Sequence, residues 1–306
     1  MAEGNHTLSG AYVTLPQLLA LRFYSKGLMT HSSRVTGNRA GQKLSRMKGR
    51  GVDFAEVRLY QPGDDVRSID WRVTARKTKP HTRVFREERE RPTLILVDQT
   101  QQMFFGSRLR LKSVAAAELA SRIAWQNLLA GDRVGGIVVS NDGNVILKPG
   151  QNNKHVARLL SAIASANQSL NATSQPADYL QTTMRNALLQ VQRLCRHNYR
   201  IFVISDFALP VSFWRPHLHH LAQHNEVELV HVQDALDRQL PPADHYTITD
   251  GNQRTRFFTG DSAMRQQYAN RYAEHEEQLS KLGAVPGMRY LRLDNADTHL
   301  DKLVWV

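Results

Sequence analysis

Two acidic residues, each directly after a run of β-forming residues, are the first candidates for chemistry in this chain. Asp98 follows Leu94 to Val97 within the sequence TLILVDQTQQ, and Asp206 follows Ile201 to Ser205. An apolar run without alternation is typical of a strand covered on both faces in a parallel sheet. The carboxyl ends of such strands form the edge where open α/β sheets bind ligands, so we expect the two carboxylates to approach each other. Because like charges repel, an ion, a proton or hydrogen-bond donors must lie between them.

Alternating helix and strand patterns provide the frame that would position this edge. Helical periodicity predicts helices at 111–130, 153–166, 178–197, 214–224 and 262–282. Strand patterns occur at 134–140, 145–148, 201–205, 227–232 and 288–293, with a hairpin at 246–258. This alternation predicts an α/β fold with a doubly wound, mostly parallel sheet of the Rossmann type.

The N-terminal third is the basic part of the chain. Residues 1–91 contain 18 Lys or Arg against 9 Asp or Glu, within a net charge of +12 for all 306 residues. A helix is expected at 14–29, with Thr14 as its cap and Phe23 near its apolar stripe, followed by a polar basic loop at 30–45. We therefore expect a basic N-terminal elaboration at 1–91, with this helix and extended β segments, and an α/β domain at 92–306. The basic segment could meet phosphate or an acidic protein surface.

Opposite charges crowd around one aromatic residue between 48 and 91. Pro62 and Gly63 mark a turn between segments expected to be extended at 57–60 and 69–73, and 81–86 alternates as a strand does. Such charges are either surface salt bridges, which stabilise little, or part of a docking surface around Trp71. The candidate partner-binding residues are Arg58, Asp64, Asp65, Arg67, Asp70, Trp71 and Arg72.

The same segment carries a family resemblance. The residues that carry it are Gly49, Gly51, Phe54, Arg58, Tyr60, Pro62, Gly63, Asp64, Asp65, Arg67, Ile69, Asp70, Trp71 and Ala75. Together they resemble the signature of a bacterial family called domain of unknown function fifty-eight. In that family the signature precedes a von Willebrand factor A-like domain, which the resemblance assigns here from Thr93 onward. The resemblance implies an adaptor or co-chaperone that acts beside a MoxR-type AAA+ ATPase on a client protein.

The resemblance also implies a divalent ion at the strand edge. Von Willebrand factor A-like domains typically hold one, and the corresponding residues here are Asp98, Thr100, Gln102, Thr182 and Asp206. Thr100 keeps the hydroxyl of the first Ser in the usual loop, whereas Gln102 replaces the second. The longer Gln102 side chain suits the rigid octahedral geometry of Mg²⁺ poorly. We therefore expect a degenerate site that is either metal-free, with the Gln102 amide donating to a carboxylate, or occupied by Mg²⁺.

Signatures of common enzymes do not occur in the sequence. It has no G-x-S-x-G elbow, no G-x-x-x-x-G-K-[ST] loop and no G-x-G-x-x-G after a strand. His217, His220 and His224 share a helical face, which is more typical of a polar surface than of a metal site. A metal-dependent hydrolase therefore ranks behind the non-enzymatic alternatives.

Composition and cysteine use favour a cytoplasmic protein. Cys195 is the only cysteine, which excludes an internal disulfide and suits a reducing compartment. No apolar run is long enough to span a membrane, and the polar residues 1–10 lack the core of a signal peptide. We expect a non-enzymatic adaptor without membrane insertion. The main alternative is a basic nucleic-acid or phosphate-binding protein, although the interleaved aromatic residues of nucleic-acid modules are missing.

Overall fold

The computed structural model describes residues 7–25, 53–77, 79–86, 91–172, 177–249, 254–298 and 304–305. The chain divides into two compact units, a larger one that combines Met1–Thr30 with Arg91–Val306 and a smaller one at His31–Glu90. This division differs from the two consecutive blocks expected at 1–91 and 92–306, because the first helix packs on the α/β domain. None of the helices in the described residues is both long and apolar enough to cross a membrane.

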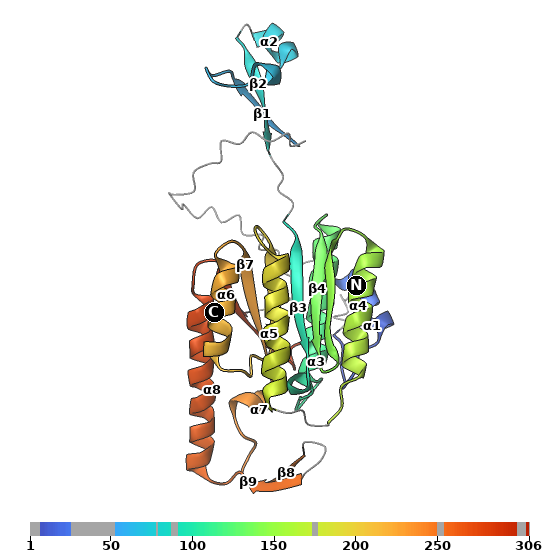
Figure 1. The fold of residues 1–306 in the computed structure, drawn as a ribbon, viewed down its shortest axis with the longest axis vertical. Helices are drawn as coiled ribbons and strands as arrows, with labels where there is room; N and C mark the ends of the chain where they lie inside the picture. Colours follow the sequence, from blue (N-terminus) through green and yellow to red (C-terminus); the bar gives the residue numbers. More distant parts are fainter. Residues whose placement is uncertain are drawn as a thin grey trace. The chain divides into compact units, whose positions relative to one another are not determined.

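A seven-stranded sheet forms the centre of the larger unit, in the order β11-β10-β7-β6-β3-β4-β5 (Figure 1). Its strands are β3 (Thr93–Gln99), β4 (Val134–Ser140), β5 (Gly143–Gly150), β6 (Arg200–Ser205), β7 (Glu226–Gln233), β10 (Met288–Asp294) and β11 (Val304–Trp305). The five central strands are parallel, and β5 and β11 pair antiparallel at the edges. The expected doubly wound, mostly parallel sheet is confirmed. After β3, the chain first forms β4 and β5 on one side of it and only later forms β6, β7 and β10 on the other side. The direction of winding therefore reverses between β3 and β6, and this is the topological switch point.

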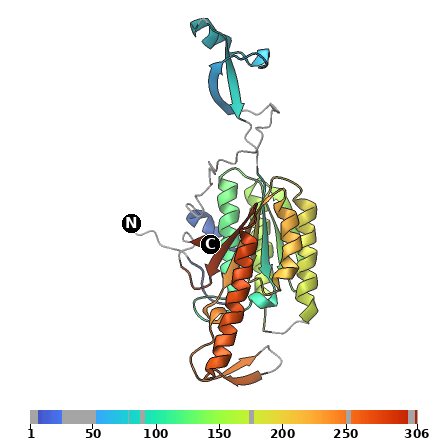
Figure 2. The same cartoon turned by 90° about the vertical axis from the view of Figure 1, so that its left-hand side faces the viewer.

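Helices cover both faces of this sheet (Figure 1 and Figure 2). One face carries α1 (Leu15–Ala20), α3 (Lys112–Leu129) and α4 (Asn153–Gln168), and the other α5 (Ala177–Leu194), α6 (Val211–Ala222) and α8 (Ser262–Gly283). Successive side chains of each strand point to opposite faces of the sheet, so they belong to two separate hydrophobic cores. In β3, Ile95 and Val97 lie in the core with α3, whereas Leu94 and Leu96 lie in the core with α6. Every residue of β3 is buried, as its unbroken apolar pattern predicts.

Short elements follow the carboxyl ends of β3 and β7. The 3₁₀ helix η3 (Gln101–Met103) follows β3, and α7 (Ala235–Arg238) follows β7. A separate two-stranded hairpin, β8 (His245–Thr249) and β9 (Arg254–Phe258), then leads into α8. This hairpin confirms the one predicted at 246–258.

The first helix is shorter than the sequence pattern at 14–29 indicates. α1 ends at Ala20 and continues as the 3₁₀ helix η1 (Leu21–Tyr24), and residues 26–29 lie outside the described part of the chain. Leu18 in α1 and Leu21 in η1 are both buried in the core. The expectation for Phe23 was wrong, because this residue of η1 is 79% exposed.

The smaller unit is a two-stranded sheet with a helical connection. β1 (Asp53–Leu59) pairs antiparallel with β2 (His81–Arg86), and η2 (Val66–Ser68) and α2 (Trp71–Lys77) lie between them. The prediction of an extended segment at 69–73 was wrong. The Asp70 carboxylate accepts hydrogen bonds from the N–H groups of Arg72 and Val73, which caps a helix at this point. Gly49, Gly51 and the loop predicted at 30–45 lie outside the described residues.

Candidate functional site at the carboxyl edge of the sheet

The two acids predicted to meet do lie at neighbouring strand ends. β3 and β6 are adjacent and parallel, so Asp98 and Asp206 reach the same edge at the switch point. Asp98 is 1% exposed and Asp206 9%. Burial and the neighbouring Asp206 charge together raise the pKa of Asp98 to about 6. The repulsion anticipated from the sequence is therefore present, and nearby groups must offset it.

Hydroxyl and amide donors surround the Asp98 carboxylate. The Thr100 N–H and Thr100 Oγ1 both donate to Asp98 Oδ1, at 2.9 and 2.7 Å. Ser205 Oγ donates to Asp98 Oδ2 at 2.7 Å. Both carboxylate oxygens of Asp98 thus accept hydrogen bonds within the protein.

Lys112 supplies the positive charge at this edge, and sequence reasoning missed it. Its Nζ lies 3.0 Å from Asp206 Oδ2 and 3.4 Å from Asp237 Oδ2, and the Lys112 side chain is 6% exposed. Burial alone would lower the pKa of Lys112, but Asp206 and Asp237 outweigh it and raise the pKa above its ordinary value. One signal was available: Lys112 is the first residue of α3, where the helix dipole disfavours a cation. The carboxylates of Asp206 and Asp237 offset this unfavourable effect.

The five residues assigned to the metal site do not share one environment. Asp98, Thr100 and Asp206 are buried, whereas the side chains of Gln102 in η3 and Thr182 in α5 are exposed. Among the described residues, no group of three or more His, Cys, Asp or Glu side chains could hold a metal ion. The Thr100 hydroxyl directs its proton to Asp98, and Lys112 already contacts Asp206. This donor set does not fit a divalent ion.

Other reactive side chains of the larger unit lie in structural positions. Cys195 is buried, and burial raises the pKa of its thiol to about 12, so the thiol stays protonated and unreactive at neutral pH. His224 packs against the ring of His197 at 4.8 Å between centroids, and His217 contacts Gln192.

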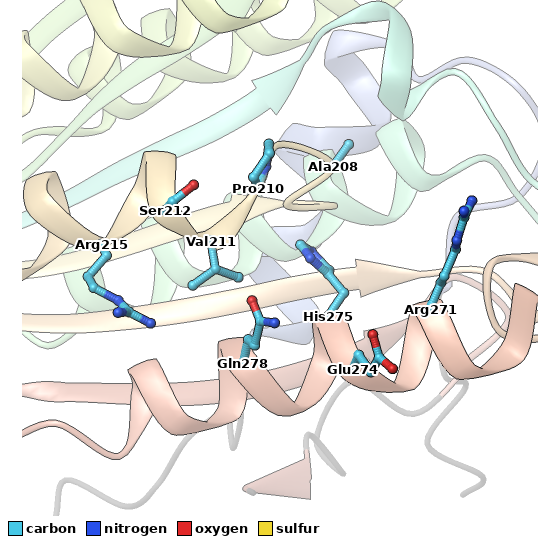
Figure 3. Close-up of a pocket in the computed structure, with 9 residues that line it drawn as sticks. All are labelled: Ala208, Pro210, Val211, Ser212, Arg215, Arg271, Glu274, His275 and Gln278. Atoms are coloured by element: carbon cyan, nitrogen blue, oxygen red, sulfur yellow. The ribbon is translucent and has the colours of Figure 1, made fainter. Parts of the chain in front are cut away.

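A cleft of about 410 Å³ opens beside the edge, between the loop after Asp206 and α8 (Figure 3). Its lining residues are Ala208, Pro210, Val211, Ser212, Arg215, Arg271, Glu274, His275 and Gln278. His275 Nε2 donates to the carbonyl oxygen of Phe207 at 2.9 Å, which ties α8 to this loop. Phe207 has a φ of +50°, a strained value for a residue with a Cβ. The cleft carries charges of both signs.

The candidate partner-binding residues of the smaller unit separate into two groups. Asp64 pairs with Arg58 at 2.8 Å and accepts from the Gln61 N–H, and Asp65 accepts from the Arg67 N–H. Asp70 pairs with Arg83 at 2.8 Å, and the hydrogen bond from Arg83 together with that from Val73 lowers the pKa of Asp70. These contacts fix the connection between β1 and β2. The candidates that remain exposed are Asp65, Arg67, Trp71 and Arg72, with Trp71 68% exposed.

Comparisons with known proteins identify relatives of this chain. Residues 56–278 match the family described as protein of unknown function DUF58. Uncharacterized proteins of Mycobacterium bovis and Mycobacterium tuberculosis are each 30% identical over 254 residues, which covers 83% of this chain and 78% of theirs.

Two solved structures are more distantly similar. The conserved hypothetical protein BatB from Bacteroides thetaiotaomicron is 16% identical with a TM-score of 0.39, covering 69% of this chain and 93% of that one. An aerotolerance-related membrane protein from Bacteroides fragilis is 15% identical with a TM-score of 0.34, covering 62% of this chain and 99% of that one. The family match, which spans most of the α/β domain and most of the charged segment before it, decides the assignment: the chain belongs to the family of proteins of unknown function DUF58.

Proposed function

We propose that this protein is a non-enzymatic, cytoplasmic adaptor or co-chaperone that binds a MoxR-type AAA+ ATPase and helps it act on a client protein. The ATPase as partner follows from the resemblance of the charged segment described above. The structural observation that supports a binding role is the exposure of Trp71 on α2, beside acids that are already engaged inside their own unit.

The exposed face of α2 has the composition of a protein-binding surface. Trp71 and Ala75 are one helical turn apart, as are Arg72 and Arg76, and all four side chains are exposed. Trp and Arg dominate the energy of protein interfaces because each combines a large contact area with directional polar contacts. Because α2 contains no acidic residue and Asp70 before it pairs with Arg83, Arg72 and Arg76 give this face a positive charge that suits an acidic partner.

The strand edge favours binding over catalysis. The hydroxyls of Thr100 and Ser205 donate to the Asp98 carboxylate, but all three side chains are buried, so none of them is accessible to a substrate. In the part of the chain described, the one thiol is buried and protonated. We therefore assign no reaction to this edge.

The first expected result concerns Trp71→Ala. The variant should melt as the wild type does, because an exposed side chain contributes little to folding, but it should bind the purified ATPase about 30-fold more weakly, equivalent to about 2 kcal/mol. Isothermal titration calorimetry measures the affinity and thermal denaturation the stability. Phe23→Ala is the matched control, since Phe23 is an equally exposed aromatic residue of the larger unit. Unchanged affinity of Trp71→Ala would contradict this surface.

A second expected result separates the adaptor from the nucleic-acid alternative. Oligonucleotide binding to the full chain should be weak, with a Kd of about 10⁻⁴–10⁻⁶ M at physiological salt, and should fall steeply as salt is added because counterions are released. Fluorescence anisotropy over a salt series provides the measurement. Sub-micromolar affinity at physiological salt would favour the alternative and count against the adaptor.

A further inference from the structure

We propose that Lys112 is the resident cation of the strand edge. Its ammonium group replaces the divalent ion that the resemblance to von Willebrand factor A-like domains implies, and the wild-type protein binds no metal there. This assignment is independent of the adaptor role and would hold for any partner.

The position of Lys112 is that of a central cation. The acids that it contacts come from two separate segments: Asp206 follows β6, and Asp237 lies in α7 after β7. Lys112 enters from a third segment, the first turn of α3. Its Nζ also lies 5.6 Å from the centre of the Phe105 ring, a favourable place for a cation. One ammonium group therefore joins elements that a metal ion would otherwise hold together.

The remaining lone pairs are also directed within the protein. Asp206 Oδ1 accepts the Ala208 N–H at 3.1 Å, while its Oδ2 accepts from Lys112. Asp98 receives the three hydrogen bonds from Thr100 and Ser205. Mg²⁺ needs oxygen lone pairs in near-octahedral geometry, so its entry would break these bonds and expel a buried lysine from two carboxylates. A tethered cation, by contrast, is always present at high effective concentration.

A consequence follows for any partner that meets this edge. A bound Mg²⁺ leaves a coordination position for a partner carboxylate, whereas an ammonium group surrounded by protein carboxylates offers none. Partner binding should therefore be indifferent to chelators. Contacts at the edge would instead come from exposed residues around it.

The test compares wild type with Lys112→Ala, Lys112→Arg and Lys281→Ala by thermal denaturation in chelator, Mg²⁺ and Mn²⁺, with calorimetric titration of each metal. Wild type and Lys112→Arg should melt at temperatures that do not depend on the metal and should show no binding heat. Lys112→Ala leaves the buried carboxylates of Asp206 and Asp237 without their cation, so it should melt at a lower temperature than wild type in chelator and in either metal. A metal ion that did bind wild type would, at a hundred times its Kd, raise the folding constant by about 100-fold.

The controls and contrary outcomes are distinct. Lys281→Ala removes a lysine that is exposed and paired with Glu277, and its melting should follow wild type under every condition. Stoichiometric Mg²⁺ uptake by wild type would overturn the proposal, and this measurement does not depend on the folding of any variant. A Lys112→Ala protein that melts like wild type would overturn it too.

Discussion

Replacing Glu118 with Ala should lower the free energy of unfolding by about 3–5 kcal/mol, the usual effect of breaking a buried ion pair. Glu118 is fully buried within α3 and pairs with both Arg110 and Arg122. Its Oε1 accepts from Arg122 Nε at 2.8 Å and Nη2 at 2.7 Å, and its Oε2 accepts from Arg110 and from the Leu8 N–H. Without this carboxylate, two buried guanidinium groups lose the anionic partner that they share.

The effect should be large because the same network joins distant parts of the larger unit. Arg110 also donates to the carbonyl oxygens of Asn295 and Asp297 near the C-terminal end, and Arg122 donates to that of Tyr24 in η1. The loss would therefore loosen the N-terminal segment as well as α3. Total stabilities of domains are about 5–15 kcal/mol, so a loss of this size is a large fraction of the total.

Urea denaturation of Glu118→Ala against wild type measures this change. Glu277→Ala is the matched control, because Glu277 pairs with Lys281 on the exposed face of α8, where it should not alter the denaturation midpoint. A loss below about 1 kcal/mol for Glu118→Ala would show that the buried network is not a major source of stability.

Asp98→Asn should become progressively more stable relative to wild type as the pH rises from about 4 to about 7. The pKa of Asp98 is about 6 in the folded protein against 3.8 as its reference value, so the folded state binds the proton more tightly. That contribution stabilises wild type fully at low pH and is lost as the pH rises through the folded pKa. A difference of about two units corresponds to about 3 kcal/mol.

Asparagine is the informative substitution because it keeps the shape of the site. Its Oδ1 can still accept from Thr100, and its Nδ2 can donate to Ser205 Oγ. The measurement is the free energy of unfolding of both proteins at several pH values, taken as a difference so that other titrating groups cancel. Asp142→Asn, in the exposed turn between β4 and β5, should leave the pH profile of wild type unchanged. Parallel profiles for Asp98→Asn and wild type would contradict the raised pKa.

Much of the α/β domain follows from local patterns in the sequence. The apolar run at β3 is typical of a strand buried on both faces, and strand-helix alternation implied parallel neighbours. From these two facts the meeting of Asp98 and Asp206 could be expected before any coordinates were known. Such patterns depend on residues two to four positions apart, which the sequence displays directly.

Local patterns were less informative at the ends of short elements. At α2, the single carboxylate of Asp70 decides between an extended segment and a helix, and Arg83 holds that carboxylate from the opposite strand. At η1, the chain winds as a 3₁₀ helix and Phe23 is exposed. Both outcomes depend on contacts that each segment makes with its surroundings.

The occupant of the strand edge was decided by tertiary structure alone. The sequence indicated that something must separate Asp98 and Asp206, and it favoured the nearby Gln102 or a metal ion. Lys112 is 94 residues from Asp206 in the chain, and Arg110 is 185 from Asn295. The periodicity of a sequence does not indicate which charged residues will come into contact when they lie this far apart in the chain. Burial then selects the partners, since a charge removed from water must find an opposite charge or a hydrogen-bonding group within the fold.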